Sequence, residues 1–363
     1  MKFHELRIKA LQKVTADTVE VTFAIPENLK DAFTFLPGQY LTIAIQVDGE
    51  TPRRAYSICS DVTKADVSIL IKKIEGGKVS SYMNDHATTN QRLLVAAPNG
   101  HFKIDPKKVV AKANYVFIGA GSGITPLISM IESLLKTNAH STCHLYYGSK
   151  TIDTIIYRTK LDRLRLVYKD RLVIHHFVSR ASRPLISTGK YGVSYHSGRV
   201  DTQYVINEIE QLKGESVNGV YLCGPAELIE QSIEKLETID LEKNLIHREY
   251  FTAPIADADD LEITYDDLPD RSVTVELAGE TVALVIKDNK DILRQLMADG
   301  YEPPYSCLQG TCSTCKAKLT EGEVKMKIDI GLESDEIEAG YILTCQSIPL
   351  SEKTHCIYEN PTL

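Results

Sequence analysis

The chain contains no tryptophan and no uninterrupted apolar run, and each absence excludes a class of protein. Without Trp or a basic stripe, the sequence gives no support for nucleic-acid binding. The most apolar stretch, residues 115–131, is broken by three glycines and a proline, so we expect no bilayer-spanning helix and no membrane partner. The N-terminal segment lacks the apolar core of a signal peptide, and we therefore expect a cytoplasmic protein.

Length and charge predict several domains with different surfaces. With 363 residues the chain exceeds the usual size of a single hydrophobic core, so two or three domains are expected. From Leu261 onward there are 19 acidic and 9 basic side chains, about −10, which leaves about +2 for the residues before it. The acidic surface therefore belongs to the C-terminal part, where it serves solubility or steers a cationic redox partner.

Four of the eight cysteines form a pattern that predicts a metal centre. Cys307, Cys312 and Cys315 follow a C-x4-C-x2-C spacing, and Cys345 lies downstream in Leu-Thr-Cys-Gln. This is the plant-type [2Fe–2S] ligand pattern. Zinc is the main alternative, but structural zinc sites usually present two separate pairs of ligands. Small residues that let backbone N–H groups turn toward the sulfurs fill the loop: Ser306, Gly310, Thr311, Ser313 and Thr314.

The N-terminal part, residues 1–108, has the pattern of an antiparallel β-barrel. Short runs with alternating apolar residues are separated by turn formers such as Pro-Gly and Asp-Gly. The expected strands cover residues 5–14, 18–25, 40–47, 55–59, 67–74 and 93–97. Regular short strands with one brief helix favour a barrel.

From residue 109 to 251 the pattern changes to alternating strands and helices. The expected strands cover residues 115–118, 143–147, 172–178 and 220–222, and the expected helices cover residues 125–136, 155–168, 202–212 and 226–237. Nearly continuous apolar strands between amphipathic helices indicate a parallel sheet covered on both faces. An acidic, proline-bearing segment at 252–260 reads as a linker to a third domain at 261–363, with strands at 272–277 and 280–286 and a helix near 292–298.

Two motifs of the barrel are suited to a flavin. Arg54-Ala55-Tyr56-Ser57 offers a guanidinium for a pyrophosphate, an aromatic ring for an isoalloxazine face and a hydroxyl for a ring nitrogen. Taken alone, an exposed arginine beside a half-buried tyrosine is the commoner interpretation of these four residues, and the neighbouring motifs favour the flavin. The segment 76–81, Gly-Gly-Lys-Val-Ser-Ser, enters the only helix expected in this part and resembles a phosphate-binding helix N-terminus. An ordinary turn with a capping serine remains the alternative.

Two motifs of the second part lie at strand ends. Gly119, Gly121 and Gly123 occupy a turn between a parallel strand and a helix, and Thr125-Pro126 open that helix. The turn departs from G-x-G-x-x-G, so its ligand is not fixed by the pattern. Residues 222–225, Leu-Cys-Gly-Pro, end a later strand at the carboxyl edge, where α/β sheets bind ligands. The cysteine there could also be a packing residue, the role we expect for Cys59, Cys143 and Cys356.

Together these motifs resemble the ferredoxin–NADP reductase superfamily fused to a plant-type ferredoxin of β-grasp-like fold, and within it the reductase components of phenylacetyl-CoA epoxidases (phenylacetate-CoA oxygenases) and related oxygenases. The resemblance implies that Arg54, Ala55, Tyr56 and Ser57 contact the flavin. It implies flavin phosphates on Gly77, Lys78, Val79, Ser80 and Ser81, and a nicotinamide nucleotide on Gly119, Gly121, Gly123, Thr125 and Pro126. Cys223, Gly224 and Pro225 would lie by the nicotinamide ring, and Glu249 and Phe251 would close over the flavin. The catalytic residues would be Ser57 and Cys223, and the cluster ligands Cys307, Cys312, Cys315 and Cys345.

The expected activity is therefore electron transfer from a nicotinamide through FAD and a [2Fe–2S] cluster to an oxygenase component. Ser179 and Arg180 resemble the pair that binds a 2′-phosphate, which favours NADPH, with NADH as the alternative. No residue excludes FMN in place of FAD. Two other hypotheses remain: an electron carrier whose flavin half does not turn over, and a reductase for another acceptor, such as a ring-hydroxylating oxygenase, a ferric chelate, a quinone or a haem protein.

Overall fold

The computed structural model describes residues 1–109, 112–181, 186–188, 192–212, 217–251, 270–287 and 289–359. The expected linker, 252–260, lies outside these residues. Contacts between Cα atoms divide the chain into two compact units. One consists of His4–Pro52 and Tyr56–Phe251, and the other of the described C-terminal residues with Met1–Phe3 and Arg53–Ala55. Among the described residues, no helix is long and apolar enough to cross a membrane.

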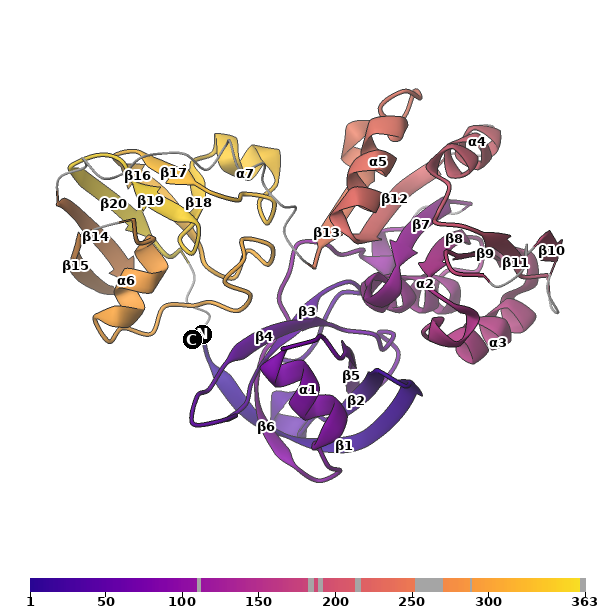
Figure 1. The fold of residues 1–363 in the computed structure, drawn as a ribbon, viewed down its shortest axis with the longest axis horizontal. Helices are drawn as coiled ribbons and strands as arrows, with labels where there is room; N and C mark the ends of the chain where they lie inside the picture. The colour runs from indigo at the N-terminus through magenta and orange to yellow at the C-terminus, as the bar shows by residue number, and fades with distance from the viewer. Residues whose placement is uncertain are drawn as a thin grey trace. The chain divides into compact units, whose positions relative to one another are not determined.

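The N-terminal part forms the expected antiparallel barrel (Figure 1). Its six strands are β1 (Phe3–Thr15), β2 (Thr18–Ala24), β3 (Tyr40–Ala44), β4 (Arg53–Ser57), β5 (Val67–Lys72) and β6 (Arg92–Ala96). They are ordered β4-β3-β6-β1-β2-β5, and a bridge between Ile58 and Ile69 joins the two ends of this sheet. Alternate residues such as Leu6 and Ile8 are fully buried, which is the period that predicted the strands. The one helix, α1 (Lys78–Asp85), packs against β5.

The second part is a parallel sheet with helices on both faces. Its strands are β7 (Asn114–Ala120), β8 (Thr142–Ser149), β9 (Leu172–Val178), β10 (Ile186–Thr188), β11 (Ser194–Ser197), β12 (Val217–Gly224) and β13 (Ile246–Tyr250), and its helices are α2 (Ile124–Thr137), α3 (Arg158–Tyr168), α4 (Thr202–Leu212) and α5 (Ala226–Leu236). The strand order is β10-β11-β9-β8-β7-β12-β13, and only the β10–β11 pair is antiparallel among the pairs described. Figure 1 shows α2 and α3 on one face and α4 and α5 on the other.

This strand order contains a switch point between β7 and β12. The chain proceeds from β7 to β8 and β9 on one side, and later returns to place β12 on the other side of β7. In open α/β sheets the crevice at the carboxyl ends of such a strand pair binds ligands. The helix expected at 155–168 begins only at Arg158, because Tyr157 adopts a left-handed conformation with φ of 61°. β10, β11 and β13 were not expected from the sequence.

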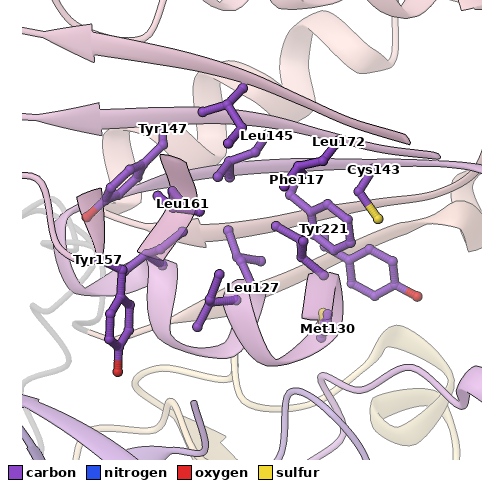
Figure 2. Packing of buried hydrophobic residues seen from close by; sticks show 14 of the residues in the cluster. Phe117, Leu127, Met130, Cys143, Leu145, Tyr147, Tyr157, Leu161, Leu172 and Tyr221 are labelled. Carbon is purple, nitrogen blue, oxygen red and sulfur yellow. The ribbon is translucent and has the colours of Figure 1, made fainter. Parts of the chain in front are cut away.

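A core of aromatic and aliphatic side chains fixes α2 and α3 against the sheet. Figure 2 shows Phe117, Leu127, Leu145, Tyr147 and Leu161 among the residues of this cluster, all of them buried. The packing cysteines Cys59 and Cys143 belong to the same core, as expected. Because α2 is buried along nearly its whole length, its position is set closely by its neighbours.

Within its described residues, 270–287 and 289–359, the C-terminal part contains a mixed five-stranded sheet and a two-stranded ribbon. The strands are β14 (Arg271–Leu277), β15 (Glu280–Ile286), β16 (Lys316–Glu321), β17 (Val324–Met326), β18 (Tyr341–Leu343), β19 (Ser347–Pro349) and β20 (Lys353–Ile357), and the helices are α6 (Ile292–Ala298) and α7 (Ser334–Glu338). The sheet has the order β15-β14-β20-β16-β18, with a parallel pair β14–β20 between antiparallel neighbours. A core around Val275, Ile292 and Cys356 lies between α6 and this sheet.

Candidate functional site

The motif Arg54 to Ser57 forms the last four residues of β4, directly before Ile58, which bridges to β5. Ser57 is 5% exposed, whereas Ala55 and Tyr56 are half-buried and Arg54 is exposed. The Arg54 guanidinium donates a hydrogen bond to the carbonyl oxygen of Arg53 at 2.7 Å. The strand therefore presents one buried hydroxyl and a half-exposed aromatic ring, and such a ring can stack on a planar ligand.

The turn before α1 divides its side chains between the barrel interior and the surface. Val79 is buried in the barrel core. The Ser80 hydroxyl accepts a hydrogen bond from Ile74 N at 3.1 Å and donates to Gly77 O at 3.3 Å. Lys78 is exposed and pairs with Glu50 at 2.7 Å. The helix starts without a side-chain cap. The groups at this turn that are suited to bind a phosphate are therefore the N–H groups of the first helical turn and the half-exposed Ser81 hydroxyl.

The glycine turn lies at the carboxyl end of β7 and contacts the end of β12. A Cβ on Gly123 would lie 2.0 Å from the carbonyl oxygen of Cys223, and one on Gly224 would lie 3.0 Å from Ala120 N. Gly121 has a φ of 57°, and its carbonyl accepts a hydrogen bond from the Tyr147 hydroxyl at 2.7 Å. These close approaches require glycine, and they bring the two motifs predicted at strand ends together at the switch point.

The second and third residues of α2, Thr125 and Pro126, complete this turn. Thr125 is buried, and its hydroxyl donates to Ser122 O at 2.7 Å, so it stabilises the turn. Pro126 occupies the first helical turn, where no intrahelical N–H partner is needed. Pro225 is the N-terminal cap position of α5, directly after Cys223 and Gly224. Both glycine-containing turns therefore lead into the N-terminus of a helix.

Three polar groups from different elements meet beside this turn. Cys223 on β12 is fully buried, and its register partner on β13 is Glu249. The Ser57 hydroxyl, from the barrel, donates a hydrogen bond to Glu249 Oε2 at 3.4 Å. Burial raises the pKa of the Cys223 thiol well above its usual value, and the nearby Glu249 carboxyl raises it further. The site therefore holds a neutral thiol beside a hydroxyl–carboxyl pair.

The pKa of Glu249 is itself perturbed. Burial raises it to about 8, against a smaller lowering by the hydrogen bond from Ser57. A carboxyl that is mostly protonated near neutral pH adds no negative charge to the site. Phe251, two residues further on, is half-buried and packs against the core of the parallel-sheet part. Both residues were expected at the flavin site, although the strand β13 that carries Glu249 was not.

Ser179 and Arg180 lie at the same carboxyl edge, after β9. Their backbone N–H groups donate to Ser149 O at 3.0 Å and Lys150 O at 2.8 Å, and both side chains are exposed. A second arginine near this edge that was not singled out in the sequence, Arg199, follows β11 and forms an exposed ion pair with Glu227. The only signal for it was a glycine followed by an arginine after an unrecognised strand.

The four cysteines lie in two pairs within the C-terminal part. Cys307 N donates toward Cys312 Sγ at 3.4 Å, and the thiols of Cys315 and Cys345 are hydrogen-bonded partners. Cys315 and Cys345 are buried, and Cys307 and Cys312 are half-buried. Within the described part of the chain, no three His, Cys, Asp or Glu side chains are grouped to hold one metal ion. Two pairs suit a centre with two irons, each held by two thiolates, better than a single zinc ion.

Polar donors surround these sulfurs. Gln309 N donates to Cys307 Sγ at 3.3 Å, and the Thr314 hydroxyl lies 3.2 Å from Cys312 Sγ. Gln346, directly after Cys345, donates its side-chain N–H to the Cys345 sulfur at 3.4 Å. Donors of this kind stabilise thiolates and tune the potential of a cluster. Gln346 was visible in the sequence only as the residue after the fourth cysteine.

Comparison with known proteins matches each of the three parts to a family. The "Oxidoreductase FAD-binding domain" family matches residues 5–104, the "Oxidoreductase NAD-binding domain" family residues 117–233, and the "2Fe-2S iron-sulfur cluster binding domain" family residues 275–350. The chain is 33% identical over 355 residues to a component of the 1,2-phenylacetyl-CoA epoxidase of Escherichia coli K12, covering 96% of each chain. It is 30% identical to the ferredoxin reductase component of the 3-ketosteroid-9-alpha-monooxygenase of Rhodococcus rhodochrous, covering 96% of this chain and 94% of that one.

Solved structures share the fold at lower identity. Phthalate dioxygenase reductase aligns over 98% of both chains, with a TM-score of 0.58 and 22% identity. An intact type IV self-sufficient cytochrome P450 monooxygenase aligns with a TM-score of 0.70 and 21% identity, covering 98% of this chain but only 41% of the P450 chain. The order of the three parts is therefore found both in a separate reductase and within a longer fused enzyme.

Proposed function

Because this chain belongs to the ferredoxin–NADP reductase superfamily with a C-terminal plant-type [2Fe–2S] domain, we propose that it transfers electrons from NADPH through FAD and the cluster to an oxygenase component. The observation that carries the proposal is the meeting of Ser57, Cys223 and Glu249 beside the glycine turn. This site joins the flavin-type barrel to the switch point of the nucleotide-type sheet, where a hydride donor and its acceptor must come face to face.

The residues of the chain divide between three tasks. Tyr56 and Ser57 would hold the flavin ring, with Arg54, Ala55 and the turn 77–81 toward its phosphates. The glycine turn 119–126 and residues 223–225 would hold the nicotinamide nucleotide, and Glu249 and Phe251 would close the flavin site. When bound, FAD accepts a hydride and passes on single electrons, which a [2Fe–2S] cluster carries one at a time.

Ser57 and Cys223 act by position rather than by proton transfer. A hydride step needs no general acid or base. The raised pKa of Cys223 keeps its thiol neutral, so it can contact a nicotinamide ring without placing a charge beside it. The Ser57 hydroxyl, held by Glu249, can turn toward a flavin ring nitrogen. These residues therefore orient two rings and exclude water.

The cluster would be held by Cys307 with Cys312 and by Cys315 with Cys345, since the thiols of each pair contact one another. Cys312 and Cys307 are the less buried pair, so that side of the cluster would be nearer to solvent and to an acceptor. We assign the domains to residues 1–108, 109–251 and 261–363, with the segment 252–260 as the linker between the second and the third. We place the reaction in the cytoplasm, where thiols stay reduced.

The proposal also specifies which nicotinamide nucleotide donates the electrons and which oxygenase accepts them. Arg180 is an exposed cation at the carboxyl edge of the sheet, which suits a 2′-phosphate and favours NADPH over NADH. For the acceptor, the identity with the Escherichia coli protein supports an oxygenase of the phenylacetyl-CoA epoxidase type. The 3-ketosteroid monooxygenase relative supports a different oxygenase as the alternative.

A cysteine substitution tests the order of electron transfer. Cys307→Ser should leave NADPH-driven reduction of a small two-electron dye intact and abolish reduction of a one-electron protein acceptor such as cytochrome c. Cys356→Ala is the matched control, because Cys356 is a buried packing cysteine of the same domain and should affect neither activity. Equal loss of both activities in Cys307→Ser would contradict the relay. A purified protein without flavin would instead favour the carrier hypothesis.

A further inference from the structure

The helix that begins at the glycine turn also contacts the barrel, through a stripe of polar side chains. Ser129, Ser133 and Lys136 are four and three residues apart on α2, so they lie along one face of the helix. Ser129 and Ser133 are fully buried. On sequence alone such a stripe reads as the solvated face of an amphipathic helix, but here it is an interface between the two parts of one compact unit.

The polar stripe of α2 forms hydrogen bonds with three consecutive barrel residues, 60–62. The Ser129 hydroxyl donates to the carbonyl oxygen of the first at 2.6 Å. The Lys136 ammonium donates to the carboxylate of the second at 2.6 Å. The N–H of the third donates to the Ser133 hydroxyl at 3.2 Å. Main chain and side chain are thus both fixed, residue by residue, against a single helix face.

Asp61, the second of these residues, is the centre of the interface. It is 0% exposed, and both carboxylate oxygens have partners: Lys136 on one and the N–H and hydroxyl of Thr63 on the other. Burial alone would raise the pKa of Asp61, but the hydrogen bonds from Lys136 and Thr63 lower it to about 2. The carboxylate therefore stays ionised, and a buried ionised group holds its partner in a defined geometry.

The interface between α2 and residues 60–62 links the flavin half of the site, at Ser57, to the nucleotide half, at Gly123. Segment 60–62 begins three residues after Ser57, and between them Cys59 N donates to Ser68 O at 2.8 Å, which fixes the segment to the barrel. At the other end, α2 starts directly after Gly123, about 20 Å along the helix from Lys136. A close approach reinforces the contact, since a Cβ on Gly38 of the barrel would lie 2.3 Å from Met130 Cε.

We propose that Ser129, Ser133 and Lys136 with residues 60–62 form a positioning clamp that sets the flavin strand against the nucleotide turn for hydride transfer. The inference rests on the proposed function. α2 carries the nucleotide turn at one end and is fixed to the continuation of the flavin strand at the other, so a shift at the clamp moves Ser57 relative to Cys223. A displacement of about 1 Å between reacting groups can cost about a hundredfold in rate.

The clamp predicts a kinetic effect that is separate from binding. In Asp61→Asn, loss of the ionic contact should lower the limiting rate of FAD reduction by NADPH about tenfold or more, with the NADPH dissociation constant changed less than twofold. Lys136→Arg, which keeps the cation, should retain most of the rate. Ser129→Ala provides a milder second variant if Asp61→Asn does not fold. Glu132→Gln is the control on the same helix, because it removes the buried carboxylate that pairs with Lys160 but keeps the Lys136–Asp61 ion pair, and it should leave the rate unchanged.

Two measurements on the full-length protein test the positioning clamp. One is anaerobic stopped-flow reduction of the bound FAD by NADPH, and the other is hydrogen–deuterium exchange with and without FAD. We expect faster exchange in peptides covering 58–63 in Asp61→Asn, and not in Glu132→Gln, together with the slower reduction. An unchanged reduction rate despite faster exchange, or an equal loss in Glu132→Gln, would overturn the clamp. A wild-type protein that binds FAD but is reduced by neither nucleotide would instead overturn the proposed function, and with it the kinetic role.

Discussion

The raised pKa of Glu249 predicts a pH dependence that one substitution should remove. Its carboxyl pairs with the Ser57 hydroxyl and lies beside Cys223, where burial raises its pKa from 4.5 to about 8. At pH 7 about nine molecules in ten would therefore carry the proton. Glu249→Gln preserves the shape and the hydrogen bond but cannot ionise, so it isolates the effect of the proton.

The sign follows from proton binding. Between pH 4.5 and 8 the folded protein holds the proton on Glu249 while the unfolded chain has released it. Stability therefore falls as pH rises through this window, by at most about 1.4 kcal/mol per pH unit, and is constant above it. From pH 5.5 to 8 the wild-type protein should lose about 3 kcal/mol of unfolding free energy that Glu249→Gln does not lose.

The assay is unfolding in urea at several pH values, followed by hydrogen exchange in peptides that cover β12 and β13, because these strands carry Cys223 and Glu249. The same pair of proteins gives a kinetic test. A hydride brings negative charge into the site, so wild-type flavin reduction should slow above about pH 8 while the variant stays flat. Parallel profiles for the two proteins, in stability and in rate, would refute the raised pKa.

Three further substitutions probe the nucleotide and cluster sites. Arg180→Ala should raise KM for NADPH about tenfold and spare NADH, measured with both nucleotides; equal effects would remove the 2′-phosphate assignment. Gly123→Ala should abolish nucleotide binding in a calorimetric titration, because the added Cβ meets the Cys223 carbonyl oxygen at 2.0 Å; normal affinity would contradict this contact. Gln346→Leu removes a hydrogen bond to Cys345 and should lower the cluster potential in a spectroelectrochemical titration, and an unchanged or higher potential would argue against that bond.

The sequence was sufficient for elements whose residues alternate or repeat regularly. The barrel strands, α4, β15 and α6 were predicted closely because apolar residues at a period of two or 3.6 mark a buried face. β13 was not, since Ile246–Tyr250 contains three polar residues in five and its partner is a distant parallel strand. The short strands β16 to β20 are likewise defined by pairing with neighbours rather than by their own composition.

The site residues divide in the same way: some are predicted by a local sequence pattern, and the roles of others depend on contacts that only the folded structure shows. Spacing predicts Cys307, Cys312 and Cys315 as cluster ligands because the three lie on one loop at fixed intervals, and Cys345 is the separate fourth cysteine of the same pattern. The role of the Ser80 hydroxyl within its own turn could not be read from the serines, because a capping serine and a phosphate-binding serine look alike. The stripe on α2 was hidden for a related reason: buried and solvated polar residues on a helix have the same spacing.

The measurement that tests the central claim most directly is an anaerobic visible spectrum of the purified protein, titrated with NADPH and then, in a second sample, with NADH. The account predicts bleaching of the flavin bands followed by loss of the iron–sulfur absorbance, with NADPH the more effective nucleotide. A cluster without flavin, or a bound flavin that neither nucleotide reduces, would contradict the relay and leave this chain with the fold of a reductase but not its activity.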